Sequence, residues 1–197
     1  MLKGSIVVFA SGTGTTFKSI YEYSISEKSS YKVAALVTNR IDCGASHLAQ
    51  EFGLPVIPFP SQHMKFLEKL KPDLIVLSGF LKIFTPEFVE KYGKKTINIH
   101  PSLLPSFGGM GFYGIRVHQA VKESGTTVTG FTVHMVEGGV DSGAVVYQHK
   151  VPVLSGDTPE DIAARVHREE LEYFPPVIDS MVKNGFTVSG KTVFINL

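Results

Sequence analysis

The stretch SIVVFASGTGTT, residues 5–16, carries the strongest indication of the fold. Its first six residues are nearly all apolar, which is typical of a strand that is buried on both faces of a sheet. A loop with two glycines follows, and residues 15–24 have the spacing of a helix. A buried strand that passes through a glycine loop into a helix predicts the first unit of an α/β fold.

The same alternation continues through the first half of the chain. Buried strands are predicted at residues 32–37 (KVAALV) and 73–78 (DLIVLS), a weaker strand at 55–58, and helices at 45–52 and about 64–70. Another helix is predicted to begin at Thr85-Pro86-Glu87, because a capping hydroxyl, a proline at the first position and an acid favour a helix start. It should end near Tyr92, before Gly93. Repeated strand–helix units of this kind predict a parallel sheet with helices on both faces.

The second half of the chain has a different pattern. After a predicted helix at 114–123, two β-rich runs at 127–136 and 144–153 are joined by a short, glycine-rich connection, 137–143 (EGGVDSG). A connection that short favours neighbouring antiparallel strands, so we expect a mixed sheet.

Two further elements are predicted near the end of the chain. A long helix begins at Thr158 and reaches about Tyr173, where Pro175 and Pro176 are expected to interrupt it. The tail, 186–197, is typical of a hairpin that turns at 189–191. The predicted fold class is therefore α/β: a Rossmann-like, mostly parallel twisted sheet with helices on both faces and an antiparallel region in the C-terminal half.

Composition limits the classes of protein that fit. The chain has 197 residues, 43% of them hydrophobic, which suits one domain spanning 1–197. Lys plus Arg is 19 and Asp plus Glu is 18, so no charge excess points to a nucleic-acid or membrane partner. Cys43 is the single cysteine and the histidines lack metal-ligand spacing, so neither a disulfide framework nor a metal is expected.

Other features predict where the protein works and with what. The apolar run at 6–10 is too short for the core of a signal peptide, and no segment has the length of a membrane span. We therefore expect a cytoplasmic protein in a reducing compartment, present as a monomer or homodimer, with small molecules as its partners.

The glycine loop at 11–16 (SGTGTT) is a candidate anion site. Main-chain N–H groups at the start of a helix favour an anion, and glycines let a ligand approach closely. The loop lacks the Gly-Lys-Ser/Thr ending of a P-loop and the third glycine of the dinucleotide fingerprint, so a phosphate monoester fits better than a nucleotide. The alternative is a tight turn that needs glycine for its own geometry.

A second candidate lies in INIHPSLLP, residues 97–105. Side chains alternate between the two faces of a strand, so Asn98 and His100 should share one face at the end of this strand. Ligands of open α/β sheets bind at that end, and an amide and an imidazolium aimed at one point would stabilise a developing oxyanion. The alternative is that both side chains anchor the proline-bounded loop at 101–105.

Asp141 and His134 complete the candidate group. Asp141 lies in the glycine-flanked connection, from which its carboxylate could reach the imidazole and favour the protonated ring; the alternative is an aspartate that only forms a turn. His134 is expected in the core or behind the reacting groups. No serine lies in a Gly-x-Ser-x-Gly context, so the residues indicate acid–base and electrostatic help for an acyl transfer without a covalent protein nucleophile.

Four segments, taken together, carry a resemblance to a known family: FASGTGTT (9–16), LSGFLKIFTPEFV (77–89), NIHPSLLPSF (98–107) and GGVDSGAVVYQHKVPV (138–153). In this order the chain closely resembles the glycinamide ribonucleotide formyltransferase family of purine synthesis, from about residue 6 to residue 178. The resemblance implies transfer of a formyl group from 10-formyltetrahydrofolate to the amine of N1-(5-phospho-D-ribosyl)glycinamide, which yields the N-formyl product and tetrahydrofolate.

The resemblance also implies roles for individual residues. His100 would be the general acid, Asn98 would hold the oxyanion, and Asp141 would support the charged His100 and move protons through water. The residues implied for the phosphoribosyl substrate are Gly14, Thr15, Thr16, Pro101 and Glu170, and those implied for the folate are Leu81, Lys82, Ile83, Phe84 and Asn98. Leu77 and Phe88 would be apolar walls for the pterin or ordinary core residues, and Glu170 could instead lie on a solvated helix face.

Some residues depart from the family pattern. Thr16 replaces an asparagine and Lys82 an arginine, which keeps the charge but loses the fork geometry of the guanidinium. Residues 61–70 form a shorter segment without the expected arginine, so no folate contact is assigned to it. Residues 106–113 (SFGGMGFY) form a longer, glycine-rich segment that we expect to be a mobile lid.

Several related functions were weighed against this one. A methionyl-tRNA formyltransferase or a formyltetrahydrofolate deformylase would need a further domain, for which 197 residues leave no room. The alternatives that stay open are a sugar-nucleotide N-formyltransferase and a non-catalytic module that binds folate or a phosphoribosyl ligand.

Overall fold

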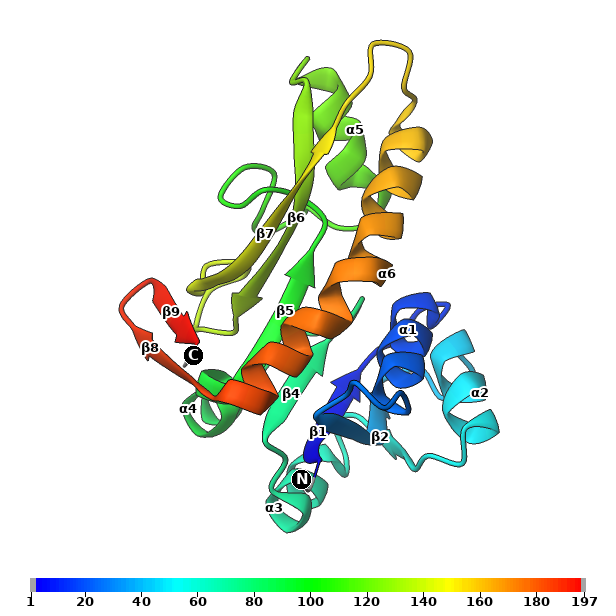
Figure 1. Cartoon of the computed structure of the whole chain (residues 1–197), viewed down its shortest axis with the longest axis vertical. Helices are drawn as coiled ribbons and strands as arrows, with labels where there is room; N and C mark the ends of the chain where they lie inside the picture. The colour runs from blue at the N-terminus through cyan, green and yellow to red at the C-terminus, as the bar shows by residue number, and fades with distance from the viewer. Residues whose placement is uncertain (1–2, 196–197) are drawn as a thin grey trace.

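A nine-stranded mixed sheet forms the centre of the molecule in the computed structural model, which describes residues 3–195 (Figure 1). Its strands are β1 (Gly4–Phe9), β2 (Tyr31–Thr38), β3 (Val56–Pro58), β4 (Leu74–Leu77), β5 (Thr96–His100), β6 (Val128–Met135), β7 (Val145–Pro152), β8 (Phe186–Ser189) and β9 (Thr192–Ile195). Their order is β3-β2-β1-β4-β5-β6-β7-β9-β8. Strands β1 to β5 are parallel, whereas β6 is antiparallel to both β5 and β7. The predicted mixed sheet is confirmed.

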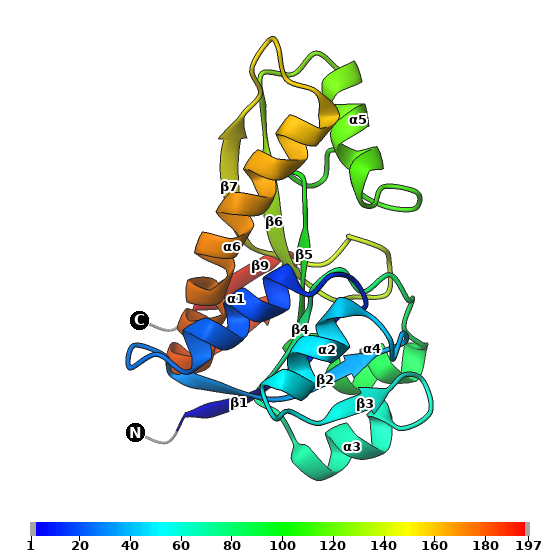
Figure 2. The ribbon, with the colours of Figure 1, turned by 90° about the vertical axis from the view of Figure 1, so that its right-hand side faces the viewer.

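Helices cover both faces of this sheet (Figures 1 and 2). They are α1 (Thr15–Ser24), α2 (Gly44–Glu51), α3 (His63–Leu70), α4 (Pro86–Tyr92), α5 (Ile115–Glu123) and α6 (Pro159–Asn184), with a short 3₁₀ turn, η1 (Gly93–Lys95). Side chains of α1, α2, α5 and α6 pack into one hydrophobic core, and those of α3 and α4 into the other. All the predicted helices are present, and their starts lie within about a residue of the expected positions.

The strand β1 shows why the two cores form. Ile6 and Val8 belong to the core beneath α1 and α6, whereas Val7 and Phe9 belong to the core beneath α3 and α4. Successive side chains of a strand point to opposite faces, so a continuous apolar run supplies both cores at once. The near-continuous hydrophobicity that marked this segment in the sequence is thus a consequence of its position between two layers of helices.

The prediction that α6 is interrupted at Pro175 and Pro176 is wrong, because the helix runs on to Asn184. A proline inside a helix lacks the N–H for one hydrogen bond and costs about 3 kcal/mol. Here the buried side chains of Phe174, Ile178 and Met181 continue one apolar stripe across the prolines. Tertiary burial of that stripe therefore overrides the local preference of the prolines.

The order of the strands indicates which edge of the sheet is suited to bind a ligand. Chain connections diverge on either side of the β1–β4 pair, so the loops that follow these two strands separate at their carboxyl ends. Open α/β sheets bind ligands in the crevice at such a switch point. Both the glycine loop and the segment 78–84 open there, beside the end of β5.

The predicted C-terminal hairpin is present over residues 186–195, and residues 196–197 of the predicted tail lie outside the described residues. β8 and β9 are antiparallel and joined at Gly190, whose φ of 57° suits a residue without a side chain. β9 also pairs with the start of β7 through Thr192 and Val145, which places the hairpin beside the connection between β6 and β7. Within residues 3–195 there is no helix with the length and apolar character needed to cross a membrane.

Candidate active site

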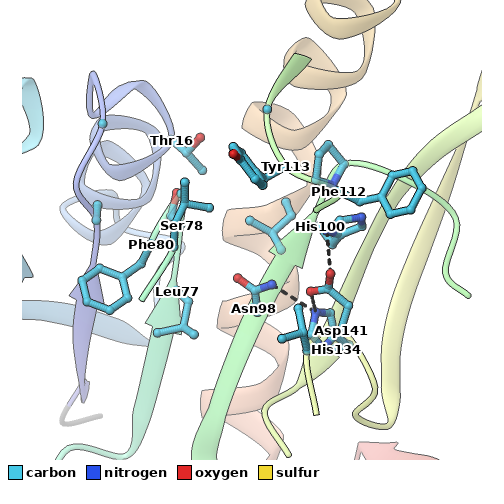
Figure 3. A pocket seen from close by; sticks show the side chains of 18 of the residues that line it. Thr16, Leu77, Ser78, Phe80, Asn98, His100, Phe112, Tyr113, His134 and Asp141 are labelled. Atoms are coloured by element: carbon cyan, nitrogen blue, oxygen red, sulfur yellow. Dashed lines mark hydrogen bonds and ion pairs between the residues drawn. The ribbon is translucent and has the colours of Figure 1, made fainter. Parts of the chain in front are cut away.

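A cavity of about 970 Å³ lies at the carboxyl ends of β1, β4 and β5 (Figure 3). It brings together every residue for which the sequence predicted a role: Gly14, Thr15, Thr16, Leu81, Lys82, Ile83, Phe84, Asn98, His100, Pro101, Asp141 and Glu170 all line it. Figure 3 shows Thr16, Ser78 and Leu77 on the β1–β4 side, and Asn98, His100 and Asp141 on the β5–β6 side. The roles of these residues remain predictions, whereas their convergence is a property of the fold.

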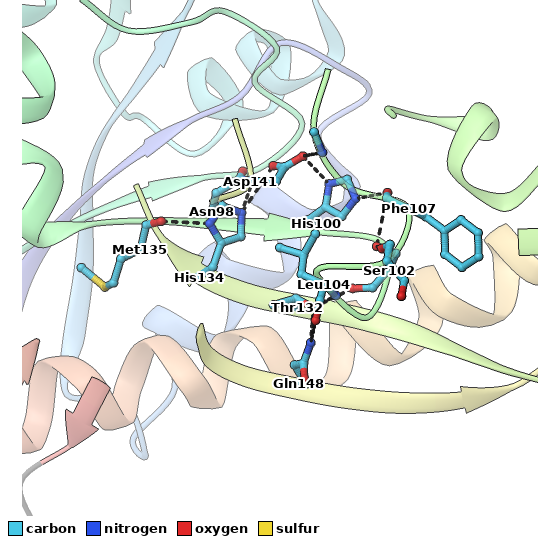
Figure 4. Close-up of polar contacts among 12 residues, drawn as sticks. Asn98, His100, Ser102, Leu104, Phe107, Thr132, His134, Met135, Asp141 and Gln148 are labelled. Atoms are coloured by element: carbon cyan, nitrogen blue, oxygen red, sulfur yellow. Dashed lines mark hydrogen bonds and ion pairs between the residues drawn. The ribbon is translucent and has the colours of Figure 1, made fainter. Parts of the chain in front are cut away.

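The His100 ring is held at both nitrogens (Figure 4). Its Nε2 lies 2.9 Å from the carbonyl oxygen of Phe107, and since a carbonyl can only accept, Nε2 carries a proton and donates it. Nδ1 lies 3.4 Å from Oδ2 of Asp141, and the side chain is almost fully buried. The main chain thus fixes the ring so that Nδ1 faces the carboxylate.

Asp141 reaches His100 by an indirect route. Because β6 is antiparallel, its last residue Met135 lies opposite Ile97, and the connection must fold back to bring Asp141 to the level of His100. Asp141 takes up a left-handed backbone conformation with φ of 52°, which costs a residue with a side chain roughly 1–2 kcal/mol. The surrounding contacts must therefore hold this conformation.

Those contacts also set the charge of the Asp141 carboxylate. Burial by itself raises the pKa of Asp141, but the adjacent rings of His134 and His100 and the N–H of Gly109, 3.0 Å away, together lower it below its usual value. The carboxylate is therefore ionised at neutral pH and stabilises a cationic imidazole beside it.

His134 orients Asn98. The Nδ1 of His134 donates to the carbonyl of Met135 at 2.9 Å, and its Nε2 faces Asn98. The Nδ2 of Asn98 donates to that Nε2 at 3.1 Å, so the amide N–H₂ keeps a second hydrogen. His134 is buried, as expected, and contacts both Asn98 and Asp141, but it also lines the cavity.

The glycine loop leads into α1 at the opposite side of the cavity. Gly14 has φ of 88°, and a Cβ there would lie 2.7 Å from the Cα of Ala45, so both the turn and the packing of α2 require glycine. No acidic side chain occupies the first turn of α1, so nothing there offsets the partial positive charge of the helix start. The tight turn is thus present, and the candidate anion site, which stays a prediction, would be formed by the same residues.

Sequence reasoning missed His167, which joins the glycine loop to α6. Its Nε2 lies 2.9 Å from Oγ1 of Thr15, and its Nδ1 lies 3.1 Å from Oε2 of Glu170. The hydrogen bond to Glu170 raises the pKa of His167, although burial opposes this shift. Glu170 is only 8% exposed, so the alternative of a solvated helix face is wrong. Contacts between residues about 150 positions apart leave no spacing signal in the sequence.

The segment 81–84 forms the wall on the β4 side. Leu81 and Ile83 are 68% and 70% exposed, which is unusual for large aliphatic side chains next to a cavity. Leu77 lines the cavity, whereas Phe88 is buried in the core between α4 and the sheet and does not line it. Of the two interpretations offered for Phe88, ordinary core is therefore the correct one.

His118 on α5 is a second histidine that the sequence did not single out. It lines the cavity, is 5% exposed, and its buried Nδ1 has no hydrogen-bond partner in the structure. Burial, together with the charge of His100, lowers the pKa of His118 to about 4. His118 is therefore neutral near pH 7, beside a histidine that is paired with a carboxylate.

The glycine-rich segment 106–113 lies over the cavity and touches the reacting groups directly. It supplies the Phe107 carbonyl to His100 and the Gly109 N–H to Asp141. Met110 at its tip is 76% exposed. That this segment is a mobile lid stays a prediction. In the structure it contacts both His100 and Asp141.

A network of buried hydrogen bonds holds the base of this segment (Figure 4). Ser102 donates to the Ser106 carbonyl at 2.6 Å, and Thr132 joins the Ser102 carbonyl to the Leu104 N–H. Gln148 donates to the hydroxyl of Thr132. These residues thus anchor the loop at 101–105, whereas the side chain of Asn98 contacts His134 and that of His100 holds only the segment after the loop, at Phe107. Among residues 3–195, no group of three or more His, Cys, Asp or Glu side chains is arranged to hold a metal ion.

An open α/β sheet with an amide, an imidazole and a buried carboxylate at its carboxyl edge defines a site suited to acyl transfer. In agreement, the sequence model of the formyl transferase family matches residues 4–178. The chain therefore belongs to the formyl transferase family.

Named relatives show which members of this family the chain is similar to. The phosphoribosylglycinamide formyltransferase of Haemophilus influenzae is 35% identical over 184 residues, which cover 88% of this chain and 84% of that protein. The chloroplastic protein of the same name from Vigna unguiculata is 39% identical over 187 residues, 89% of this chain and 60% of that protein. The crystal structure of glycinamide ribonucleotide transformylase 1 from Symbiobacterium toebii has a TM-score of 0.89 at 29% identity, covering 99% of this chain and 95% of that one. The chain thus spans about 60% of the length of its plant relative.

Proposed function

We propose that this chain, with residues 1–197 acting as one domain, transfers a formyl group from 10-formyltetrahydrofolate to the amine of N1-(5-phospho-D-ribosyl)glycinamide. The observation that carries the proposal is the convergence of Asn98, His100 and Asp141 at one end of the cavity. Relatives that carry the name phosphoribosylglycinamide formyltransferase match most of the chain, which supports this choice of substrates.

The reaction follows from the geometry of these three side chains. The amine nitrogen attacks the formyl carbon, a C–N bond forms, and the electron pair of the carbonyl moves to its oxygen. The free N–H of Asn98 donates to that negative oxygen and contributes about 3–4 kcal/mol in sites of this type. The protonated His100 stabilises the oxygen through its positive charge, because its two nitrogens already face the Phe107 carbonyl and Asp141. The C–N10 bond then breaks, and the proton lost by the amine ends on N10 of tetrahydrofolate.

Asp141 would contribute to two steps of this reaction. Its ionised carboxylate favours the imidazolium before attack, and it can pass the amine proton through water to the leaving nitrogen. The protein forms no covalent bond with the formyl group in this scheme.

The two substrates would contact different segments of the cavity wall. The phosphate fits the main chain of Gly14 and the hydroxyls of Thr15 and Thr16, with His167 as a cation next to it. Glu170 and Pro101 line the same cavity and would contact the rest of this substrate. The pterin fits the apolar segment 81–84, where Lys82 supplies the positive charge that the family's arginine would give.

The decisive experiment is an assay of the purified chain with both substrates, in which tetrahydrofolate and the formylated product are measured together. We expect both products in equal amounts, and none with His100→Ala in place of the parent. A chain that binds both ligands without turnover would be a binding module, and turnover only with an amino-sugar nucleotide would indicate a sugar-nucleotide N-formyltransferase. Either result would overturn the proposal.

We also propose the compartment, the partners and the oligomeric state of the protein. Cys43 is a free, buried thiol, which supports a reducing compartment, and we place the activity in the cytoplasm. The absence of nucleic-acid and membrane partners and the monomeric or homodimeric state stay predictions, which sedimentation of the purified chain with and without RNA or vesicles would test.

A further inference from the structure

The C-terminal hairpin contacts the connection that carries Asp141. Strands β8 and β9 lie beyond residues 4–178, the part of the chain that the family model matches. Thr192 of β9 pairs with Val145, the first residue of β7, so the turn of the hairpin lies next to the end of the connection 137–143. An element outside the matched family region thus packs against the loop of a reacting residue.

Lys191, in the turn of the hairpin, closes this contact. Its Nζ donates to Oε2 of Glu137 at 3.0 Å and also to the carbonyl oxygen of Ser142. The other oxygen of Glu137 accepts the N–H of Ala144 at 3.2 Å. Lys191 and Glu137 therefore tie both ends of the connection together, and one tie falls on the residue directly after Asp141.

The connection 137–143 needs such a contact because few other interactions fix its main-chain conformation. Three of its seven residues are glycines, which leave the main chain free to take many conformations. Asp141 itself lies in the left-handed region, and its carboxylate is held only at the tip, by His100, His134 and the N–H of Gly109. Two of these three groups belong to the reacting cluster and one to the lid.

We propose that Lys191 is a positioning residue that holds the main chain around Asp141 so that its carboxylate faces His100. This inference rests on the proposed function, in which Asp141 supports the cationic His100. Lys191 does not line the cavity and its side chain is 69% exposed, so it acts on the reaction through the connection and not by touching a substrate. The titratable groups facing Asp141 are His100 and His134, and the one facing Lys191 is Glu137.

The first test compares Lys191→Met with Lys191→Arg, and with Lys183→Met as the matched control. Lys183 is an exposed lysine near the end of α6, the helix that precedes the hairpin. We expect Lys191→Met to lower kcat three- to tenfold with less than a twofold change in either KM, since the substrates do not touch the connection. The alkaline limb of its pH–rate profile should also move to lower pH, because a displaced Asp141 carboxylate stabilises the imidazolium of His100 less. Lys191→Arg and Lys183→Met should stay within twofold of the parent.

A second measurement does not depend on turnover. Hydrogen exchange of the amides at 138–142 should become faster in Lys191→Met and remain unchanged in Lys183→Met. If the parent lacks the proposed activity, this measurement still reports whether Lys191 holds the connection. Faster exchange without any change in kcat or in the pH profile would overturn the positioning role.

The third test is a double-mutant cycle with Asp141→Asn. If Lys191 acts through the Asp141 carboxylate, adding Lys191→Met to Asp141→Asn should cause no further loss of kcat. A loss equal to that seen in the parent background would show that Lys191 acts independently of Asp141 and would contradict the inference, as would an effect confined to KM.

Discussion

The two halves of the cavity differ in the kind of group that they present (Figure 3). On the β1–β4 side the wall consists of main chain at Gly14, hydroxyls, and exposed aliphatic side chains such as Leu81 and Ile83. On the β5–β6 side it consists of buried imidazole, amide and carboxylate groups that contact one another at 3.1–3.5 Å. The parallel half thus presents main chain, hydroxyls and apolar side chains, and the half around β6 presents a cluster of titratable and amide side chains; under the proposed function the first binds and the second reacts.

The difference follows from the direction of the strands. Parallel strands all end at one edge, so the loops after β1 and β4 can meet a ligand there with their main chain. Placing β6 antiparallel to β5 brings His134 directly opposite Asn98, which puts two polar side chains in contact within the sheet itself. We therefore expect substitutions in the first half to change KM and those in the second to change kcat.

The largest effect is expected from removing a group that stabilises the oxyanion. His100→Ala and Asn98→Ala should each lower kcat by roughly a hundredfold or more, because the first removes a preorganised positive charge and the second a preorganised donor. Both KM values should change far less. Steady-state kinetics with both substrates would measure this, and His47→Ala, which alters an exposed histidine of α2, is the control.

Near-normal turnover in either variant would refute the assignment of that residue. An equal loss in His47→Ala would instead show that the assay responds to general damage.

Gly14→Ala is expected to weaken substrate binding more than turnover. A Cβ at Gly14 would lie within 3 Å of Ala45 and of the Leu48 side chain, in a backbone conformation that alanine avoids. The loop must shift, and we expect the KM for the phosphoribosyl substrate to rise roughly tenfold, while kcat changes less. Gly12 lies in the same loop, and a Cβ added there would meet no atom within 4 Å, so Gly12→Ala is the matched control.

A KM unchanged in Gly14→Ala would show that the loop does not hold the phosphate. The same holds if a substrate that lacks the phosphate binds as well as the intact one.

What could be predicted from the sequence was whatever depends on neighbouring residues. The alternation that puts Asn98 and His100 on one face is a property of any strand, and the glycine loop after β1 is contiguous in the chain. His167 and Lys191 were missed because their partners, Thr15 and Ser142, are 152 and 49 positions away. Such contacts depend on how α6 and the hairpin are packed, which no local pattern records.

The continuation of α6 through Pro175 and Pro176 was missed for a related reason. The local preference was interpreted correctly, but the burial that overrides it is decided by the sheet beneath the helix. The same applies to Asp141, whose reach to His100 depends on a connection that folds back from the far end of β6.

A smaller and pH-dependent effect is expected from His167→Gln. Because Glu170 raises the pKa of His167, the ring stays cationic to higher pH than a free histidine, and its attraction for a phosphate is lost only as the pH rises through that raised value. The variant should bind the phosphoribosyl substrate about three- to tenfold more weakly at pH 6.5 and nearly as well as the parent at alkaline pH. Calorimetric titration at several pH values would measure the difference, with the exposed Arg168→Gln as control. A difference that does not depend on pH would show that the charge of His167 is not involved.

The smallest effect is expected in the acid stability of the folded chain, and it concerns the reacting half alone. His118 has a pKa near 4 in the folded protein against 6.5 for an ordinary histidine, so between these values the unfolded chain binds a proton that the folded chain does not. Stability must therefore fall as the pH is lowered from 6.5 towards 4. His118→Phe removes this proton, and its urea midpoint should depend less on pH over that interval than the midpoint of the parent, whereas His47→Ala should leave the dependence as it is. If His118→Phe and the parent lose stability in parallel over that interval, the buried His118 ring is not the group that takes up the proton, and neither is Asp141, whose lowered pKa makes stability fall only at still lower pH.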